Sequence, residues 1–316
     1  MELKEKFVER MKLLLKEDYE NYLKILDKPY LNSIRCNTLK ISVDKLKTRL
    51  ENLGWRLNQP FESNPEIMII ESELEPGEIG RSIEHLLGYF YIQETSSMMP
   101  PIALNPSKED IILDLCASPG SKTTQIASMM ENRGTLFAND VNIGRIRILS
   151  SNLQRCGVTN TVVSQHEGSN LCSRFKKMDI KFDKILLDAP CSGEGTIRLN
   201  PKTASMFNEG LIRKMSNIQR SLISSVFSIL KVGGEMTYST CTHGPEENEE
   251  VVSFFLENFP VEIREIKLPI KTRKGLTEWQ GKKFHSDTFK SARIYPQDNN
   301  TEGFFIAKFK KLGELK

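Results

Sequence analysis

Hydrophobic positions recur with two different periods along this 316-residue chain. The regular strand–helix alternation from residue 111 onward predicts an α/β fold with a doubly wound, mostly parallel sheet. Lys231 and Gly233-Gly234 are expected to end the longest helix. The expected strands, short runs rich in Ile, Leu, Val and Phe, are 111–115, 135–139, 161–164, 182–187 and 235–239, with edge strands at 261–264 and 304–309. The expected helices, with apolar residues every three to four positions, are 121–130, 143–156, 203–230 and 246–259.

The first ninety residues have a different, mixed pattern. A helical period covers 4–26 and 43–53, and Gly54 is expected to end the second of these helices. Short strands are expected at 33–37, 55–57 and 67–70. Residues 1–90 are therefore predicted to form a small α+β domain, with the acidic stretch 71–80 at its edge, and residues 91–316 a second domain. At the start of the second domain, residues 94–104 should form a helix capped by Thr95 or Ser96.

The segment 111–127, IILDLCASPGSKTTQIA, contains a candidate ligand site. Ligands of open α/β sheets bind where such a turn leaves the carboxyl end of a strand, and Gly120 allows close approach of the backbone. The segment has neither GxGxxG nor GxxxxGK[ST], which disfavours a dinucleotide or a phosphate loop. Asp140 ends the next strand, where a carboxylate can accept hydrogen bonds from ribose hydroxyls. A nucleoside without a pyrophosphate fits, and S-adenosylmethionine (AdoMet) is the commonest such ligand.

Composition and charge narrow the class of protein. A hydrophobic share of 39% and a charged share of 27% are typical of a soluble globular protein. No apolar run approaches the roughly 20 residues of a membrane span, and the charged N-terminus is unlike a signal peptide, so a cytoplasmic location is expected. Residues 1–60 carry 13 Lys and Arg against 9 Asp and Glu, and residues 261–316 carry 13 against 7. These basic ends permit contact with nucleic acid, and Arg35, Lys40 and Lys45 are candidates for phosphate contacts.

Two of the six cysteines stand at informative positions. No CxxC pair and no histidine at metal-ligand spacing accompanies any of them, so neither a disulfide framework nor a metal site is expected. Cys191 follows the strand 185–187 within DAPCSG, and Cys241 follows the strand 236–239 within STCT. Because the carboxyl ends of parallel strands meet at one edge of the sheet, both thiols are expected beside the nucleoside loop. This placement favours a chemical role over simple burial.

Three motifs, DLCASPGSKTTQ, LLDAPCSGEGT and YSTCTHGPEENEEVV, closely resemble those of the Sun-type (Fmu) RNA cytosine-5 methyltransferases. RCNTLK, YIQETSSMMP, RIYP and EGFF extend the resemblance over nearly the whole chain. The resemblance implies a Rossmann-like AdoMet-dependent methyltransferase core behind a small N-terminal RNA-recognition-like domain, without a metal. It implies that AdoMet is held by Cys116, Ala117, Ser118, Pro119, Gly120, Ser121, Lys122, Asp140, Arg145, Asp188 and Glu167. Ser121 stands where the family usually has glycine, and Glu167 where it usually has aspartate.

The resemblance also implies a covalent mechanism on cytosine. The Cys241 thiolate would add to C6 and make C5 nucleophilic toward the AdoMet methyl group, and Cys191 would serve product release. Asp188 would hydrogen-bond the cytosine N3 or exocyclic amine, and Lys122 would orient that carboxylate or activate a thiol. The target base must leave any stack to reach these groups. The compact chain favours tRNA over ribosomal RNA as the substrate, and a monomer is expected.

Three other functions explain the sequence less well. A nicotinamide oxidoreductase would need the absent glycine fingerprint. A non-catalytic AdoMet- or RNA-binding protein would tolerate the loss of either cysteine, and both are present. A DNA cytosine methyltransferase would share the covalent logic but attack with the Pro-Cys cysteine, here Cys191. The second cysteine, Cys241, favours RNA.

Overall fold

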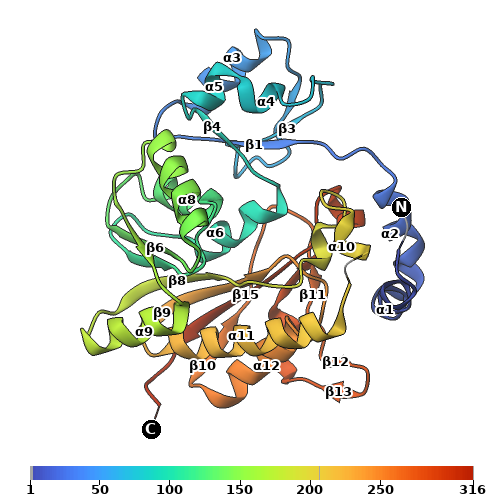
Figure 1. Cartoon of the computed structure of the whole chain (residues 1–316), viewed down its shortest axis with the longest axis vertical. Helices are drawn as coiled ribbons and strands as arrows, with labels where there is room; N and C mark the ends of the chain where they lie inside the picture. The colour runs from blue at the N-terminus through green and yellow to red at the C-terminus, as the bar shows by residue number, and fades with distance from the viewer. Residues whose placement is uncertain (1–2, 206, 316) are drawn as a thin grey trace.

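The computed structural model describes residues 3–205 and 207–315 and is dominated by one large mixed sheet (Figure 1). The order of its strands is β11-β14-β15-β9-β8-β5-β6-β7, and β10 pairs with β15. The five strands from β7 to β9 are parallel, and the remaining four add antiparallel. The strands are β5 (Ile111–Asp114), β6 (Thr135–Asp140), β7 (Thr161–Gln165), β8 (Phe182–Asp188), β9 (Leu230–Thr240), β10 (Val261–Arg264), β11 (Arg273–Lys274), β14 (Ala292–Ile294) and β15 (Phe304–Lys311).

The order of the strands reverses beside β5. From β5 the chain proceeds to β6 and β7 on one side, then returns to β8 and β9 on the other. Such a switch point opens a crevice at the carboxyl ends of the strands, which is where ligands of doubly wound sheets bind. The predicted fold class is therefore confirmed, and the segment after β5 lies at its expected binding edge.

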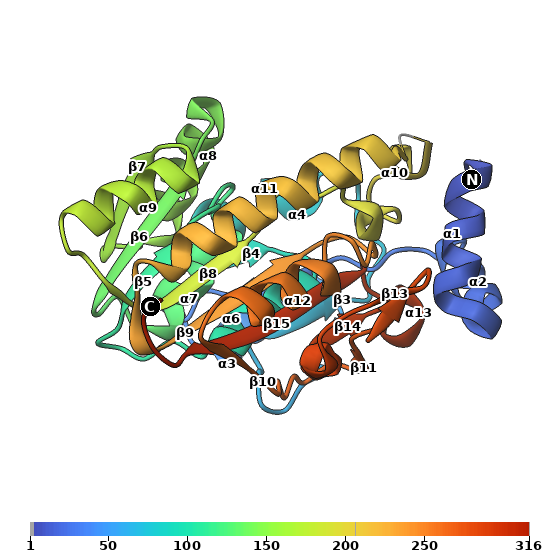
Figure 2. The ribbon, with the colours of Figure 1, turned by 90° about the horizontal axis from the view of Figure 1, so that it is seen from below.

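Helices cover both faces of the large sheet. On one face α6 (Met99–Leu104), α7 (Ser121–Met129) and α8 (Ile143–Cys156) pack through Leu104, Ile126 and Leu149. On the other face lie α9 (Gly168–Lys177), α11 (Glu209–Phe227) and α12 (Glu249–Asn258), and Figure 2 shows α11 and α12 running side by side. The largest apolar cluster of the molecule fills the space beneath these last three helices, with Phe182 and Phe255 fully buried in it.

Four details of the secondary structure correct the predictions from sequence. The expected helix 203–230 is divided into α10 (Lys202–Ser205) and α11, and Leu230 already begins β9. The segment 304–309 is not an edge strand, because β15 pairs with β9 on one side and with β14 and β10 on the other. Neither Thr95 nor Ser96 caps a helix; the Glu94 carboxylate instead accepts from the Ser97 N–H at 2.9 Å. Helix α9 was not expected.

The N-terminal module is a four-stranded antiparallel sheet of order β2-β3-β1-β4. Its own core is formed by Ile34, Leu46, Trp55 and Phe90. The last strand, β4, crosses residue 90, which is the predicted boundary between the domains. The elements are β1 (Ser33–Cys36), α3 (Val43–Glu51), β2 (Leu57–Asn58), β3 (Ile67–Ile70), α4 (Glu78–Arg81), α5 (Ile83–Leu86) and β4 (Phe90–Ile92).

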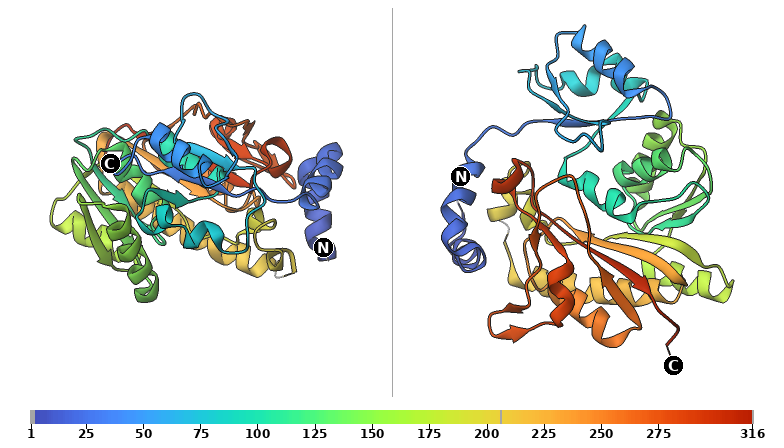
Figure 3. Two further views of the ribbon diagram at one scale, coloured as in Figure 1. Left: turned by 90° about the horizontal axis from the view of Figure 1, so that it is seen from above. Right: turned by 180° about the vertical axis from the view of Figure 1, so that it is seen from behind.

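The expected helix 4–26 is two helices, and they lie outside this module. Lys16, with a φ of 53°, separates α1 (Glu5–Leu15) from α2 (Tyr19–Leu26). Phe7 and Tyr22 pack instead against residues of the second predicted domain, including Ile212 and Tyr295. Figure 3 shows this pair of helices set apart from the four-stranded sheet and beside the C-terminal segments. There the chain also forms the short elements β12 (Glu278–Trp279), β13 (Lys282–Lys283) and α13 (Pro296–Asn299).

Polar contacts, some buried and some exposed, fix the N-terminal module to the core. Arg35 on β1 donates to the Ser121 carbonyl at 2.9 Å and to the Thr124 hydroxyl at 2.9 Å, both at the start of α7. Lys40 donates to two backbone carbonyls, at 2.8 and 2.7 Å, and one of them belongs to Arg155 at the end of α8. The expected phosphate contact of Arg35 is therefore wrong, because its side chain is buried and used inside the protein. Lys40 is exposed, so its phosphate contact stays a prediction. Lys45 is exposed, as a phosphate contact requires.

Candidate active site

The loop from Cys116 to Gly120 joins β5 to α7 and is held rigidly by its neighbours. Gly120 has a φ of 104°, a left-handed conformation that favours glycine. The Ser118 carbonyl accepts from Arg145 at 2.6 Å, and the Pro119 carbonyl accepts from Asn152 at 2.9 Å. Both donors lie on α8, so that helix fixes the outer face of the loop, while Arg35 holds its end at Ser121.

Buried polar atoms without partners line the inner side of this loop. Among the described residues, neither Asp114 Oδ1 nor Ser118 Oγ has a hydrogen-bond partner. The other carboxylate oxygen of Asp114 accepts from the Thr123 hydroxyl at 2.7 Å, and burial raises the pKa of Asp114 to about 7. Since buried polar groups are nearly always satisfied, these two atoms indicate a site for a polar ligand. Asp114 was not singled out from sequence, although its position at the end of a buried strand signals it.

Asp140 stands at the end of β6 as predicted, with an almost completely buried side chain. One carboxylate oxygen accepts from the Asn142 N–H at 3.0 Å, and the other lies 3.3 Å from the Arg145 guanidinium. Each oxygen keeps a further lone pair that can accept a hydrogen bond from a ribose hydroxyl. The Asp140 carboxylate and the loop before it therefore fit a nucleoside.

Glu167 has a structural role that its residue type explains. Its carboxylate accepts from the backbone N–H groups of Ser169 at 3.0 Å and Asn170 at 2.8 Å, and so caps the first turn of α9. The residue follows β7 at the same edge of the sheet as Asp140. Contact between Glu167 and the adenine end of a nucleoside stays a prediction.

The two cysteine sulfur atoms lie 3.2 Å apart, although 50 residues separate them in the chain. Cys191 follows β8 and Cys241 follows β9, which is the next strand in the sheet. The pKa of Cys191 is raised well above its usual value, first by its hydrogen bond to Cys241, and then by burial and by the charge of a Cys241 thiolate. Cys191 is therefore a protonated thiol that can donate to the sulfur of Cys241.

Lys122 and Asp188 form an ion pair next to the thiols. The Lys122 ammonium lies 2.7 Å from one carboxylate oxygen of Asp188 and donates to the Ser97 hydroxyl at 2.9 Å. The second carboxylate oxygen of Asp188 accepts from the Ser239 hydroxyl at 2.7 Å. Asp188 is thus held from two elements, α7 and β9, and as a paired carboxylate it can only accept hydrogen bonds from a substrate.

A cavity of about 200 Å³ opens in front of this ion pair. Its wall contains the Cys241 thiol, and Phe304 at the start of β15 adds an aromatic face that also contacts the Lys122 ammonium, 5.1 Å from the ring centroid. Glu94 and Glu302 complete the polar part of the wall. Of these residues, Cys241, Asp188 and Lys122 were expected from the sequence, whereas Phe304 and the two glutamates were not. Glu302 and Phe304 belong to the EGFF motif, and only their position in the cavity wall indicates a chemical role for it.

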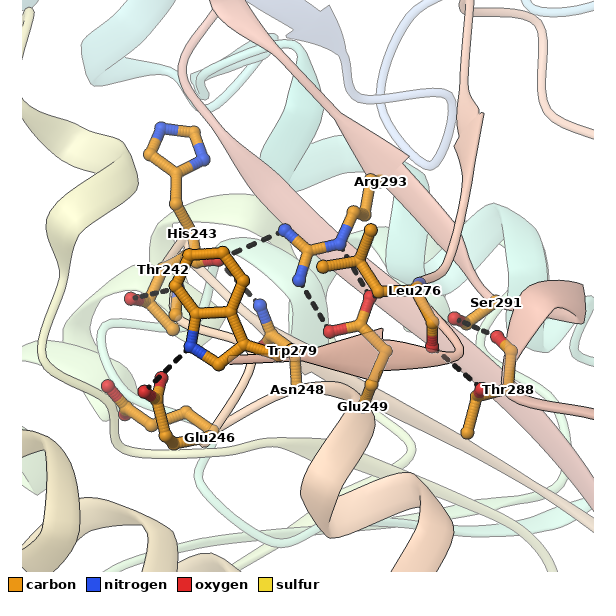
Figure 4. Close-up of polar contacts among 12 residues, drawn as sticks. Thr242, His243, Glu246, Asn248, Glu249, Leu276, Trp279, Thr288, Ser291 and Arg293 are labelled. Carbon is orange, nitrogen blue, oxygen red and sulfur yellow. Dashed lines mark hydrogen bonds and ion pairs between the residues drawn. The ribbon is translucent and has the colours of Figure 1, made fainter. Parts of the chain in front are cut away.

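A buried network behind Cys241 fixes the end of β9 (Figure 4). Arg293 on β14 donates to the His243 carbonyl at 3.0 Å and forms a two-point ion pair with Glu249 of α12. Asn248 donates to the Thr242 carbonyl at 3.0 Å. The two residues after Cys241 are therefore held through their carbonyls, which leaves the thiol little freedom to turn away from the cavity.

The doubly wound sheet, the loop with unpartnered polar atoms at its switch point and the thiol pair at the same edge are the features of the AdoMet-dependent methyltransferase fold class. Residues 101–310 match the family model described as 16S rRNA methyltransferase RsmB/F, and residues 3–95 match the N-terminal domain of 16S rRNA methyltransferase RsmF. The chain belongs to this Sun-type family of RNA (cytosine-5)-methyltransferases. Among the described residues no helix is long and apolar enough to cross a membrane, and no cluster of His, Cys, Asp or Glu could hold a metal ion.

Individual relatives and solved structures are similar to this chain over nearly all of its length. The tRNA (cytosine(49)-C(5))-methyltransferase of Pyrococcus abyssi is 41% identical over 98% of this chain and 96% of its own length. The ribosomal RNA small subunit methyltransferase F of Vibrio campbellii is 38% identical over 98% of this chain, but the chain spans only 63% of that protein. A methyltransferase homologue from Pyrococcus horikoshii, 35% identical, has a TM-score of 0.85 over 98% of this chain and 95% of its own. The NSun6 structure from Pyrococcus horikoshii with SFG, 26% identical, has a TM-score of 0.81 over 98% and 99% of the two chains.

Proposed function

We propose that this enzyme transfers the methyl group of AdoMet to C5 of a cytosine in tRNA, through a covalent bond between Cys241 and C6 of the base. The pair of thiols at the ends of two adjacent strands, 3.2 Å apart, supports this proposal most directly. A purely structural role would not explain why Cys241 borders a cavity whose wall also contains Asp188 and Lys122. A mechanism in which a thiol acted only as a general base would need only one of the two sulfur atoms.

The surroundings of the thiols assign them different tasks. The cavity exposes Cys241 to a base, and the Cys191 thiol can stabilise negative charge on the Cys241 sulfur by hydrogen bonding. When Cys241 bonds to C6, its negative charge is lost, and with it two of the causes that raise the pKa of Cys191. Cys191 is then better able to lose its own proton and to act as a base in the release steps. Thus one thiol adds first and the other serves the second half of the reaction.

Asp188 and Lys122 position the base. The Asp188 carboxylate would accept a hydrogen bond from the exocyclic amine of cytosine, a group that uracil lacks. Lys122 holds that carboxylate through its ion pair and is itself held by Ser97. The ring of Phe304 offers an apolar surface for the pyrimidine.

AdoMet fits the loop Cys116–Ser121 with Lys122, Asp140, Arg145, Glu167 and Asp188 around it. When bound, AdoMet supplies an electrophilic methyl group. Asp140 would hold the ribose, and the unpartnered Ser118 hydroxyl and Asp114 oxygen would find polar partners in the ligand or its bound water.

Similarity to the archaeal tRNA enzyme supports tRNA as the substrate, because the match extends over 96% of that protein. The N-terminal module would contact the RNA through exposed cations such as Lys45 on α3. Such contacts with phosphate make affinity fall with added salt. We expect the protein to act on the RNA as a monomer in the cytoplasm.

Bisulfite mapping tests the proposal. Unmodified tRNA and small-subunit ribosomal RNA are each incubated with the enzyme and AdoMet, and protected cytosines are counted at every position. We expect one or a few protected positions in tRNA, position 49 being the first to inspect, and none after incubation with the Cys241→Ala variant. Protection confined to ribosomal RNA would refute the choice of substrate, and protection by Cys241→Ala would refute the mechanism.

A further inference from the structure

Addition of a thiolate to C6 requires a proton donor on the other side of the base. As the C6–S bond forms, the C5=C6 electron pair moves toward C4, and the C4=N3 pair moves onto N3. Negative charge at N3 must be neutralised for the enamine to form. Asp188 cannot supply a proton while it is paired with Lys122 and accepts from Ser239. Another group of the cavity must therefore donate to N3.

Glu302 is placed for this task. It lines the cavity together with Cys241 and Asp188, and its side chain is only 2% exposed. One carboxyl oxygen, Oε1, accepts from the Leu199 N–H, whereas Oε2 has no partner among the described residues. A buried carboxyl group with one engaged and one unengaged oxygen is the arrangement expected of an acid that carries its proton on the free oxygen.

The other polar groups of the cavity wall are already engaged. The Glu94 carboxylate accepts from the Glu302 N–H at 3.1 Å with one oxygen and from the Ser97 N–H at 2.9 Å with the other. Lys122 donates to Asp188 and Ser97. These contacts leave Glu302 as the carboxyl group with an unengaged, buried oxygen in this wall.

The charges that face Glu302 favour its neutral form. Burial raises the pKa of Glu302 to about 8, and the nearby Glu94 carboxylate acts in the same direction. The Leu199 and Arg198 N–H groups and the Arg198 guanidinium oppose the shift without cancelling it. Lys122 faces the same cavity. Tyr22 and Tyr30 also lie within electrostatic range of Glu302, and both are neutral because burial raises their pKa values.

We propose that Glu302 is the general acid that protonates N3 of the target cytosine as Cys241 adds to C6. This role rests on the proposed function above. The O–H bond of Glu302 breaks and an N3–H bond forms while the C6–S bond is made, so the ring stays neutral. After methyl transfer the C5 proton leaves to a base, the C6–S bond breaks, and the N3 proton returns to the Glu302 carboxylate. Each turnover therefore leaves the carboxyl group as it began.

The same pair of carboxyl groups distinguishes cytosine from uracil. Cytosine offers an amine donor at C4 and an acceptor at N3, which match an accepting Asp188 and a donating Glu302. Uracil offers an acceptor at C4 and a donor at N3. The accepting Asp188 would then face an acceptor, and the donating Glu302 would face a donor. A polar mismatch of this kind in a buried site rejects the wrong base strongly.

The test compares Glu302→Gln with wild type over pH 6 to 9.5. The glutamine keeps an oxygen for the Leu199 N–H and an N–H for N3, but it has no acidic proton. Two rates are measured: kcat/KM for tRNA methylation, and the formation of the covalent RNA adduct in the Cys191→Ala background. Glu131→Gln, an exposed substitution far from the cavity, is the matched control.

We expect the wild-type rates to fall as the pH rises through about 8, because Glu302 then loses its proton. Glu302→Gln should be at least about tenfold slower at pH 7 in both assays and should lack this alkaline fall. A wild type whose rates stay constant up to pH 9.5, or a Glu302→Gln variant that keeps the alkaline fall, would overturn the role of Glu302. Absence of methylation by the wild type, or methylation by Cys241→Ala, would instead overturn the proposed function on which this role depends.

Discussion

At the scale of single residues, Cys241 and Cys191 differ in what surrounds them, and their removal should leave different species behind. Cys241→Ala should bind RNA, form no product and form no covalent complex, because nothing can add to C6. In Cys191→Ala the addition and the methyl transfer can proceed, but release fails. Cys191→Ala incubated with RNA and AdoMet should therefore accumulate a slowly migrating protein–RNA species on a denaturing gel.

The double variant is the control for this experiment and should show no such species. If Cys241→Ala traps RNA while Cys191→Ala is inert, the nucleophile is Cys191, as in the DNA enzymes. If neither single variant loses methylation, both thiols are structural.

Asp140 gives a second prediction at this scale. Its buried carboxylate keeps a free lone pair on each oxygen for the ribose hydroxyls, and charge-assisted hydrogen bonds contribute about 1.5–3 kcal/mol each. Asp140→Ala should weaken AdoMet binding at least about tenfold by calorimetry. Circular dichroism should show an intact fold. Unchanged affinity would place the ribose elsewhere.

At the scale of elements, Arg35 connects the N-terminal sheet to the loop that would hold AdoMet. It donates from β1 to Ser121 and Thr124 at the start of α7, and burial lowers its pKa to about 10, which leaves it charged at neutral pH. Arg35→Met should lower the free energy of unfolding by about 3 kcal/mol or more, because several buried partners lose a charged donor. It should also weaken AdoMet binding, measured by calorimetry.

Lys45→Ala is the contrasting variant, since Lys45 is exposed on α3. It should leave stability and AdoMet affinity unchanged while reducing RNA affinity and its dependence on salt. If Arg35→Met instead lost RNA affinity and kept its full stability, Arg35 would contact phosphate, as expected from the sequence.

At the scale of the whole molecule, buried acids should make stability depend on pH in an unusual direction. Burial raises the pKa of Asp114 and Glu247 to about 7 and that of Glu302 to about 8. Between the ordinary carboxyl range and these values the folded protein binds more protons than the unfolded chain, so stability falls as the pH rises. Burial also lowers the pKa of His243 to about 3, so stability falls as the pH drops below about 6.5.

These opposing effects place the stability maximum at a mildly acidic pH. Urea unfolding at a series of pH values should show a free energy of unfolding that declines steadily from pH 6 to 9. Glu302→Gln should decline less steeply, because one of the three acids is gone. A flat or rising curve over this range would show that these carboxyl groups ionise normally in the folded protein.

The fold class and the proximity of the two cysteines could be predicted from the amino-acid sequence alone. Strand runs separated by helical periods are local patterns, and they specify a doubly wound sheet because each element must bury its apolar face against the next. The placement of Cys191 and Cys241 at the ends of strands was enough to predict their meeting, since parallel strands align their carboxyl ends. Asp140 was predictable for the same reason.

The uses of individual charged residues depend on the tertiary structure. Arg35 has the sequence of an exposed cation, and its burial depends on a module that docks on α7. Glu302 is an ordinary glutamate until Leu199, Glu94 and the wall of the cavity enclose it. The partners of these side chains on α7, at Leu199 and at Glu94 lie 86 to 208 residues away in the chain, so no local pattern contains them. The desolvation that sets a pKa is likewise a property of the packed molecule and not of the chain.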